Sequence, residues 1–189
     1  MSSTLIQNVR LLCPASGTDR VSDVRLEDGR ISHIGAAPAA DQTLDGRGQW
    51  LMPAAIDLCA RLREPGATAK ATIASETAAA LGAGIGLVVM PPDTKPVADT
   101  AAVIDRIHAK AAQAGAARVR VLGALTQGLQ GEALAELSAL KAAGVVGVSN
   151  GMAPLANLLL ARRALEYANG LGLTRSEEHT SELQSHSDL

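Results

Sequence analysis

Apolar and polar positions along the chain follow two different periods, and the change comes near Trp50. Before it, short apolar stretches at residues 4–11 and 21–26 predict β-strands. The segment EDGRISHIG, residues 27–35, places an Asp-Gly pair directly before another strand-like run, which predicts a tight hairpin. Residues 1–50 are therefore expected to form a small β unit.

After this point, short apolar runs alternate with stretches of helical period. We expect strands within 51–60, 84–90, 117–125, 145–149 and 171–174, and helices over 68–82, 97–115, 131–143 and 154–170. Thr68 is the candidate cap of the first helix. Such alternation indicates an α/β fold of parallel βαβ units. The pattern predicts roughly the first half of a (β/α)8 TIM-type barrel over residues 51–174, although a doubly wound sheet fits it too. In a barrel, functional side chains follow the C-terminal ends of the strands.

Composition narrows the class of protein. The 189 residues carry a net charge of -2 and contain no Phe, so the core has to be built from Ala, Leu, Val and Ile. The absence of a basic cluster argues against a nucleic-acid partner. No apolar run approaches the roughly 20 residues that span a bilayer, and the first residues do not resemble a secretory signal. Two cysteines are too few for a disulfide framework. We therefore expect a soluble cytoplasmic protein with no membrane partner.

The last residues, 175–189, differ in character from everything before them. They are rich in Ser, Glu, His and Thr, which is typical of a disordered polar tail. The string RSEEHTSELQSH, from Arg175 to His186, also resembles the in-frame translation of a DNA-sequencing adapter. We therefore expect an artefactual tail that begins after about Thr174 and carries no biology.

The segment MPAAIDLCARLREPG, residues 52–66, lies at the first expected strand end. It resembles the signature of dihydroorotases in the amidohydrolase superfamily, which read Asp-x-His-x-His followed by Leu-Arg-Glu-Pro-Gly. In that family both histidines lie on one face of the strand and bind zinc. Here Asp57 and the LREPG segment, residues 62–66, are present. The two histidine positions hold Cys59 and Arg61.

These replacements decide the functional interpretation. A thiolate at Cys59 is able to ligate zinc, but the guanidinium of Arg61 has no acceptor and stays charged. A fixed positive charge also repels a divalent cation. Hydrolysis of the dihydroorotate ring relies on metal to generate hydroxide and to polarise the amide. We therefore expect no catalytic residues and no bound cofactor, in contrast to the zinc of active family members.

Two further segments resemble the same family and depart from it at functional positions. In VMPPDTKPV, residues 89–97, Asp93 stands where the family has an Asn that helps to hold the substrate carboxylate. The segment 123–151 matches the family pattern GAxTxGxxG and then ends in Ser-Asn-Gly. Asn150 and Gly151 occupy the positions of two aspartates, one of which is a metal ligand in the most similar dihydroorotases. Three separate departures at functional positions indicate a pseudoenzyme.

A remnant pocket of Asp57, Arg63 and Asp93 is the other candidate site. Arg63 corresponds to the arginine that grips the substrate carboxylate in the family, so such a pocket would bind a small anion. The alternative, which we favour, is that LREPG persists as a structural turn and that Asp57 orients the barrel mouth. His33 and His108 do not fall at strand ends, and we interpret both as surface or packing residues.

The resemblance implies a specific role. Some bacteria carry an inactive dihydroorotase-like chain that assembles with the catalytic chain of aspartate carbamoyltransferase and supports it in pyrimidine biosynthesis. We expect a noncatalytic homologue of this kind, oligomeric when full length. Two alternatives stay open: an active zinc-dependent dihydroorotase or related cyclic amidohydrolase with rearranged ligands, and a small-anion binding protein that uses Arg63.

Overall fold

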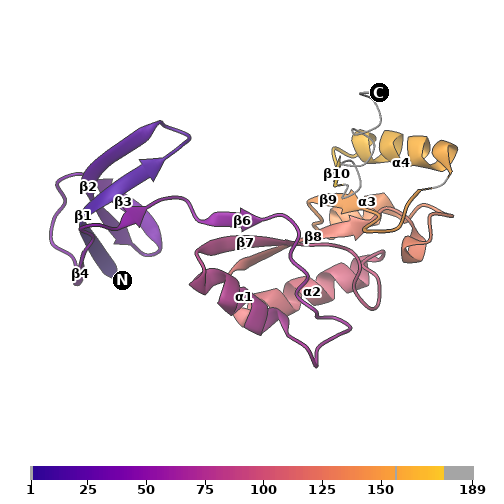
Figure 1. Cartoon of the computed structure of the whole chain (residues 1–189), viewed down its shortest axis with the longest axis horizontal. Helices are drawn as coiled ribbons and strands as arrows, with labels where there is room; N and C mark the ends of the chain where they lie inside the picture. Colours follow the sequence, from indigo (N-terminus) through magenta and orange to yellow (C-terminus); the bar gives the residue numbers. More distant parts are fainter. Residues whose placement is uncertain (1, 156, 177–189) are drawn as a thin grey trace, which may run out of the picture. The chain divides into compact units, whose positions relative to one another are not determined.

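The computed structural model of the chain describes residues 2–155 and 157–176. It divides into two compact units, Met1–Ala54 and Ala55–Leu189 (Figure 1). No helix of the described residues is long and apolar enough to cross a membrane.

The first unit is a β-sheet with strand order β3-β2-β1-β4, in which β5 also pairs with β1. Its strands are β1 (Ser3–Cys13), β2 (Thr18–Glu27), β3 (Arg30–Ile34), β4 (Gln42–Asp45) and β5 (Trp50–Leu51). The predicted hairpin is confirmed, because β2 and β3 pair in antiparallel orientation. They are joined through Asp28 and Gly29, whose φ values of 47° and 74° are left-handed, as this tight turn requires. Val9, Leu11 and Val24 form the small core of this unit.

The second unit is a parallel sheet whose strand order, β10-β9-β8-β7-β6, follows the order of the chain. Its elements are β6 (Ala55–Asp57), α1 (Ile73–Gly82), β7 (Ile85–Met90), α2 (Ala101–Ala114), β8 (Arg118–Ala124), the 3-10 turn η1 (Gln127–Leu129), α3 (Leu137–Ala142), β9 (Gly147–Ser149), α4 (Leu158–Gly170) and β10 (Thr174–Arg175). A doubly wound sheet reverses its strand order at a switch point. The sequential order therefore confirms the half-barrel.

The core of the second unit lies between the sheet and its helices. Ile73, Ile104 and Ile107 from α1 and α2 pack with strand residues such as Val88 and Val121, and all five are almost fully buried. Figure 1 shows α1 and α2 side by side below β6, β7 and β8. This layer of aliphatic side chains fits the composition, because no Phe is present to fill the space.

The four helices of the described residues each begin several residues later than the hydrophobic pattern predicts. The prediction that Thr68 caps α1 is wrong, because Thr72 is the N-cap and forms a reciprocal capping box with Ser75. α3 begins late because the segment between β8 and α3 forms η1 and a short antiparallel bridge. Helical periodicity continues through these loops, so the pattern alone does not reveal where the caps lie.

Little of the expected tail falls within the described residues. Arg175, the first residue of that tail, pairs with Val148 in the parallel ladder between β10 and β9. The remainder, residues 177–189 with His179 and His186, lies outside the described residues.

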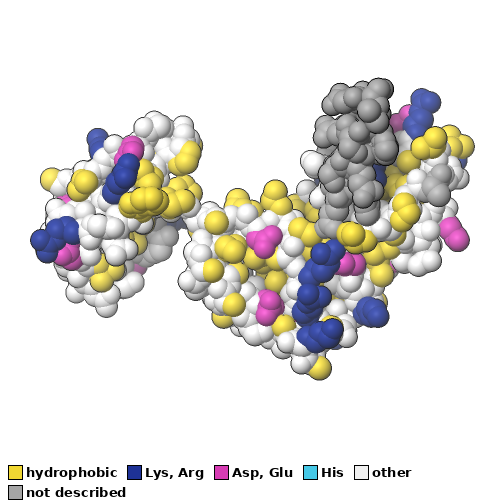
Figure 2. Space-filling model, in the orientation of Figure 1, with side chains coloured by type: hydrophobic (Ala, Val, Ile, Leu, Met, Phe, Trp, Pro, Cys, Tyr) yellow, Lys and Arg dark blue, Asp and Glu magenta, His cyan; other side chains and the backbone are white. Residues whose placement is uncertain are grey.

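We predict that residues 1–189 produced alone self-associate. Within the described part of the chain, β6 and β10 are the edges of the parallel sheet. Apolar side chains of this unit reach the surface (Figure 2): Ile56 of β6 is 59 % exposed, Leu58 71 % and Leu158, the first residue of α4, 82 %. Unpaired edges and exposed apolar surface promote association. Light scattering should detect oligomers that bind a hydrophobic dye; a monomer with a sharp cooperative unfolding transition would contradict this.

Candidate functional site

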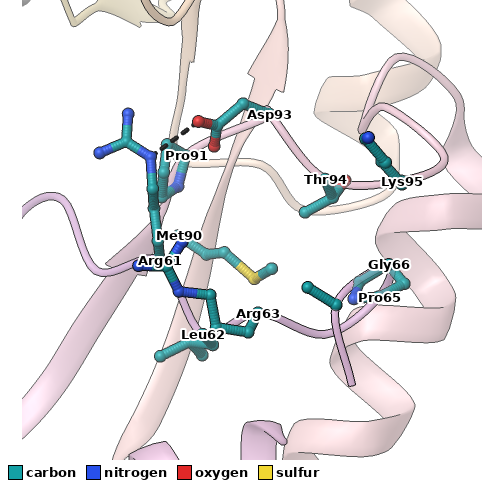
Figure 3. A pocket seen from close by; sticks show the side chains of 11 residues that line it. Arg61, Leu62, Arg63, Pro65, Gly66, Met90, Pro91, Asp93, Thr94 and Lys95 are labelled. Atoms are coloured by element: carbon teal, nitrogen blue, oxygen red, sulfur yellow. Dashed lines mark hydrogen bonds and ion pairs between the residues drawn. The ribbon is translucent and has the colours of Figure 1, made fainter. Parts of the chain in front are cut away.

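The residues identified from the sequence follow the C-terminal ends of β6, β7 and β9, where a barrel carries its functional groups. The loops that follow β6 and β7 are in direct contact (Figure 3). Ala60 donates its backbone N–H to the carbonyl of Val89 at 2.9 Å, and Lys95 donates to the carbonyl of Pro65 at 3.2 Å. Backbone hydrogen bonds therefore hold the two loops against each other.

An ion pair joins the two strand ends. Arg61 Nε donates to Asp93 Oδ2 at 2.7 Å, and the two side chains are 34 % and 33 % exposed. Such a charge-assisted hydrogen bond is shorter and stronger than a neutral one, although an exposed pair typically contributes only about 0–1 kcal/mol. The ion pair thus joins two segments that are 32 residues apart in the chain.

The end of β9 approaches the same place. A Cβ built on Gly151 would lie 3.9 Å from Asp93 Cβ, and the φ of Gly151 is +59°, a conformation that favours glycine. Asn150 beside it is fully buried. Its Oδ1 accepts from Thr126 Oγ1 at 2.6 Å and its Nδ2 donates to the carbonyl of Ala153 at 2.9 Å. Both ends of the Asn150 amide are therefore used inside the protein.

Thr126 of the GAxTxGxxG motif has a structural role. Besides donating to Asn150, its hydroxyl accepts the backbone N–H of Gly131 at 3.0 Å. The N–H of Gly128, where φ is +57°, binds Asp99 Oδ2 at 2.8 Å. These hydrogen bonds hold the loop after β8 against the ends of its neighbouring strands. Thr126 and Gly128 of the motif therefore hold the loop in place.

Glu64 of the LREPG segment ties its loop to two helices. Its Oε2 accepts the N–H of Ile73 at the first turn of α1 at 3.0 Å. Its Oε1 lies 3.5 Å from Lys110 Nζ on α2, and the Glu64 side chain is only 13 % exposed. A carboxylate at a helix N-terminus satisfies an open N–H and interacts favourably with the helix dipole.

Asp57 and Cys59 form a local turn at the end of β6. The backbone N–H of Cys59 donates to Asp57 Oδ1 at 2.9 Å, while the Cys59 side chain is exposed. Asp57 thus stabilises the turn that follows β6, as in an Asx turn. This arrangement supports the interpretation of Asp57 as a residue that orients the barrel mouth.

The residues present do not fit a zinc site. Such a site needs three or four nitrogen, sulfur or oxygen donors in tetrahedral geometry. Arg61 is a cation, Gly151 has no side chain, and the oxygen of Asn150 is bound to Thr126. No group of three or more His, Cys, Asp and Glu that could hold a metal ion occurs within residues 2–155 and 157–176.

Neither histidine of the described residues replaces the missing ligands. His108 lies beside Gly144, with its Cε1 3.4 Å from a Cβ built on that glycine. Gly144 precedes β9, so this contact is at the opposite end of the sheet from Asp93. His33 belongs to β3 in the first unit.

A model of the family described as Dihydro-orotase-like matches residues 48–171. The chain belongs to this family. The family expected from the sequence is therefore confirmed, and the half-barrel is part of an amidohydrolase barrel.

Relatives of this dihydroorotase-like chain carry two kinds of name. A "Dihydroorotase-like protein" of Pseudomonas aeruginosa is 46 % identical over 172 residues, which are 89 % of this chain and 41 % of the relative. A "Dihydroorotase" of Anaeromyxobacter sp. (strain K) is 42 % identical over 177 residues, 92 % of this chain and 41 % of the relative. The chain thus spans about 41 % of the length of these relatives.

Solved structures share the fold. The L-hydantoinase (dihydropyrimidinase) of Arthrobacter aurescens superposes with a TM-score of 0.73 at 21 % identity, covering 93 % of this chain and 40 % of that one. A dihydroorotase superposes with a TM-score of 0.66 at 14 % identity, covering 93 % of this chain and 50 % of that one. At these identities the likeness establishes the architecture.

The sequence predicts the strand ends of this dihydroorotase-like chain, but the ion pair between Arg61 and Asp93 was missed. The assignment of Cys59, Arg61, Asn150 and Gly151 to metal-ligand positions stays a prediction. The opposite charges of Arg61 and Asp93, at the ends of consecutive strands, were the signal from which their ion pair could have been found.

We predict that Glu64→Gln lowers the free energy of unfolding of the full-length protein by about 1–2 kcal/mol. The neutral amide weakens the hydrogen bond to the α1 N-terminus and removes the charge that faces Lys110. Urea unfolding measures the change. Glu132→Gln, at an exposed position, is the matched control. Equal stability of the two variants would show that LREPG does not brace the helices.

Proposed function

We propose that this chain is part of a noncatalytic dihydroorotase homologue that supports the assembly of aspartate carbamoyltransferase in pyrimidine biosynthesis. The ion pair between Arg61 and Asp93 is the observation that supports a noncatalytic protein. It lies where the family resemblance puts a metal ligand and a residue that contacts substrate.

The chemistry of the site supports an inactive protein. Ring opening of a cyclic amide needs an activated water and a polarised carbonyl, which metal supplies in this family. Arg61 brings a permanent positive charge, and the carboxylate of Asp93 is already engaged with it. The amide of Asn150 is held by Thr126 and Ala153. These side chains offer neither a ligand set nor a base that would generate hydroxide.

The retained fold supports a structural role. Glu64, Thr126 and Asn150 keep their loops braced although the expected metal ligands are replaced. A protein that keeps the scaffold and loses the chemistry is suited to presenting a surface to a partner. The partner itself, the catalytic chain of aspartate carbamoyltransferase, is proposed from the family resemblance, and so is the oligomeric state.

An active zinc-dependent dihydroorotase is the second candidate. It is favoured by the relatives named "Dihydroorotase", which are 42 % identical to this chain. In that case Cys59 and Asp57 would have to ligate zinc together with groups from elsewhere in the protein. This candidate requires hydrolysis of dihydroorotate by the full-length protein.

Co-expression of the full-length protein with the transferase chain tests the proposal. We expect a tag on either chain to retain both in a fixed ratio through size-exclusion chromatography, and we expect no dihydroorotate hydrolysis by the complex. The transferase prepared without its partner is the control for assembly. Two separately eluting and separately active proteins would contradict the structural role, and dihydroorotate turnover would favour the second candidate.

A further inference from the structure

We propose that the inner face of the parallel sheet binds an acidic part of this same protein. The segment that follows residue 174 in the full-length chain supplies carboxylates to Arg118 and Arg120 of β8. Membership of the family implies that the barrel closes, but it does not give the charge of the part that closes it. The inference goes beyond the proposed function, because it holds for an active and for an inactive protein alike.

The two arginines lie on the face of β8 that is turned away from the helices. Side chains alternate between the two faces along a strand. Val119 and Val121 of β8 are buried in the core between the sheet and its helices, whereas Arg118 and Arg120 are exposed. Figure 1 shows α1 and α2 below these strands, so the arginines project from the opposite side. That side is the one that a closed barrel encloses.

The neighbours of both arginines on this face are apolar. In the parallel ladder between β7 and β8, Arg118 pairs with Leu87 and Arg120 pairs with Val89. Leu87 pairs in turn with Ile56 of β6, which is 59 % exposed. Side chains that form rows across consecutive strands in this way make up the layers of a barrel interior. The arginines therefore belong to layers that the rest of the barrel has to fill.

Neither guanidinium has a counter-charge in the part of the chain that the structure describes. Within residues 2–155 and 157–176, the Arg118 and Arg120 side chains make no hydrogen bond or ion pair. The strands β7, β8 and β9 contain no Asp or Glu. Asp57 of β6 pairs with Val88 of the core between sheet and helices, and its Oδ1 accepts the N–H of Cys59. The counter-charge has to come from elsewhere.

Enclosing these arginines without an anion would be strongly destabilising. A buried lysine is able to lose its proton, but a guanidinium stays charged under all conditions in which a protein folds. An ion taken out of water therefore needs a partner of opposite charge with good hydrogen-bond geometry. A carboxylate meets the planar fork of arginine with two parallel hydrogen bonds. The surface that covers this face is therefore expected to carry Asp or Glu.

The length of the relatives and the strand order identify what covers the face. The chain spans about 41 % of the relatives that it matches. Within the described residues, the first and last strands of the parallel sheet, β6 and β10, are its two edges. Further strands in the same order would close the sheet from β10 round to β6 and enclose the inner face. The occupant is therefore the part of this protein after residue 174.

Arg120→Met in the full-length protein tests the proposal. Methionine keeps a long flexible side chain and removes the charge. We expect the melting temperature to fall by at least about 5 °C, because an enclosed carboxylate is left without its partner. Arg106→Met, at an exposed position of α2, is the matched control and should change the melting temperature by less than about 1 °C. Arg118→Met provides a second measurement if Arg120→Met yields no soluble protein.

A second substitution identifies the carboxylate. Each Asp or Glu that follows residue 174 in the full-length protein is replaced by Asn or Gln in the Arg120→Met background. We expect at least one replacement to restore half or more of the lost melting temperature, as coupling between two residues in contact requires.

Three results would overturn the proposal. The first is a melting temperature of Arg120→Met equal to that of the control, and the second is a loss that no neutralised carboxylate restores. The third is a melting temperature that rises with protein concentration in the wild type but not in Arg120→Met, which would assign the face to a second copy of the protein. None of these measurements depends on the transferase or on dihydroorotate turnover.

Discussion

The ion pair between Arg61 and Asp93 is the interaction on which the account of this molecule depends. Arg61 follows β6 and Asp93 follows β7, and their side chains carry opposite charges. Together they neutralise one another and connect the ends of β6 and β7. The ion pair also places a permanent positive charge where the family resemblance implies a metal ligand, and such a charge disfavours a divalent cation.

The family motifs in this chain separate into residues that brace the scaffold and positions that would carry chemistry. Glu64 accepts the N–H of Ile73 at the first turn of α1, and Thr126 fastens the loop after β8 to Asn150. The positions of Cys59 and Arg61 contribute little to the core, because the first is exposed and the second half-exposed.

Much of the fold could be predicted from the sequence. The period of apolar positions located the strands and helices, and the Asp-Gly pair at residues 28–29 located the hairpin. Helix starts were missed because capping depends on particular side chains such as Thr72 rather than on periodicity. Of the site, the strand ends could be identified. The pairing of Arg61 and the approach of Lys95 could not, because both depend on how two loops fold against each other.

The zinc content of the full-length protein, purified without chelators and then offered zinc, tests the central claim most directly. Because Arg61 holds a permanent positive charge against Asp93 at the strand ends, we expect near-zero metal per chain before and after the addition. One or two tightly bound zinc ions per chain would contradict the account. Cys59 would then be a ligand, and the chain would belong to a working amidohydrolase.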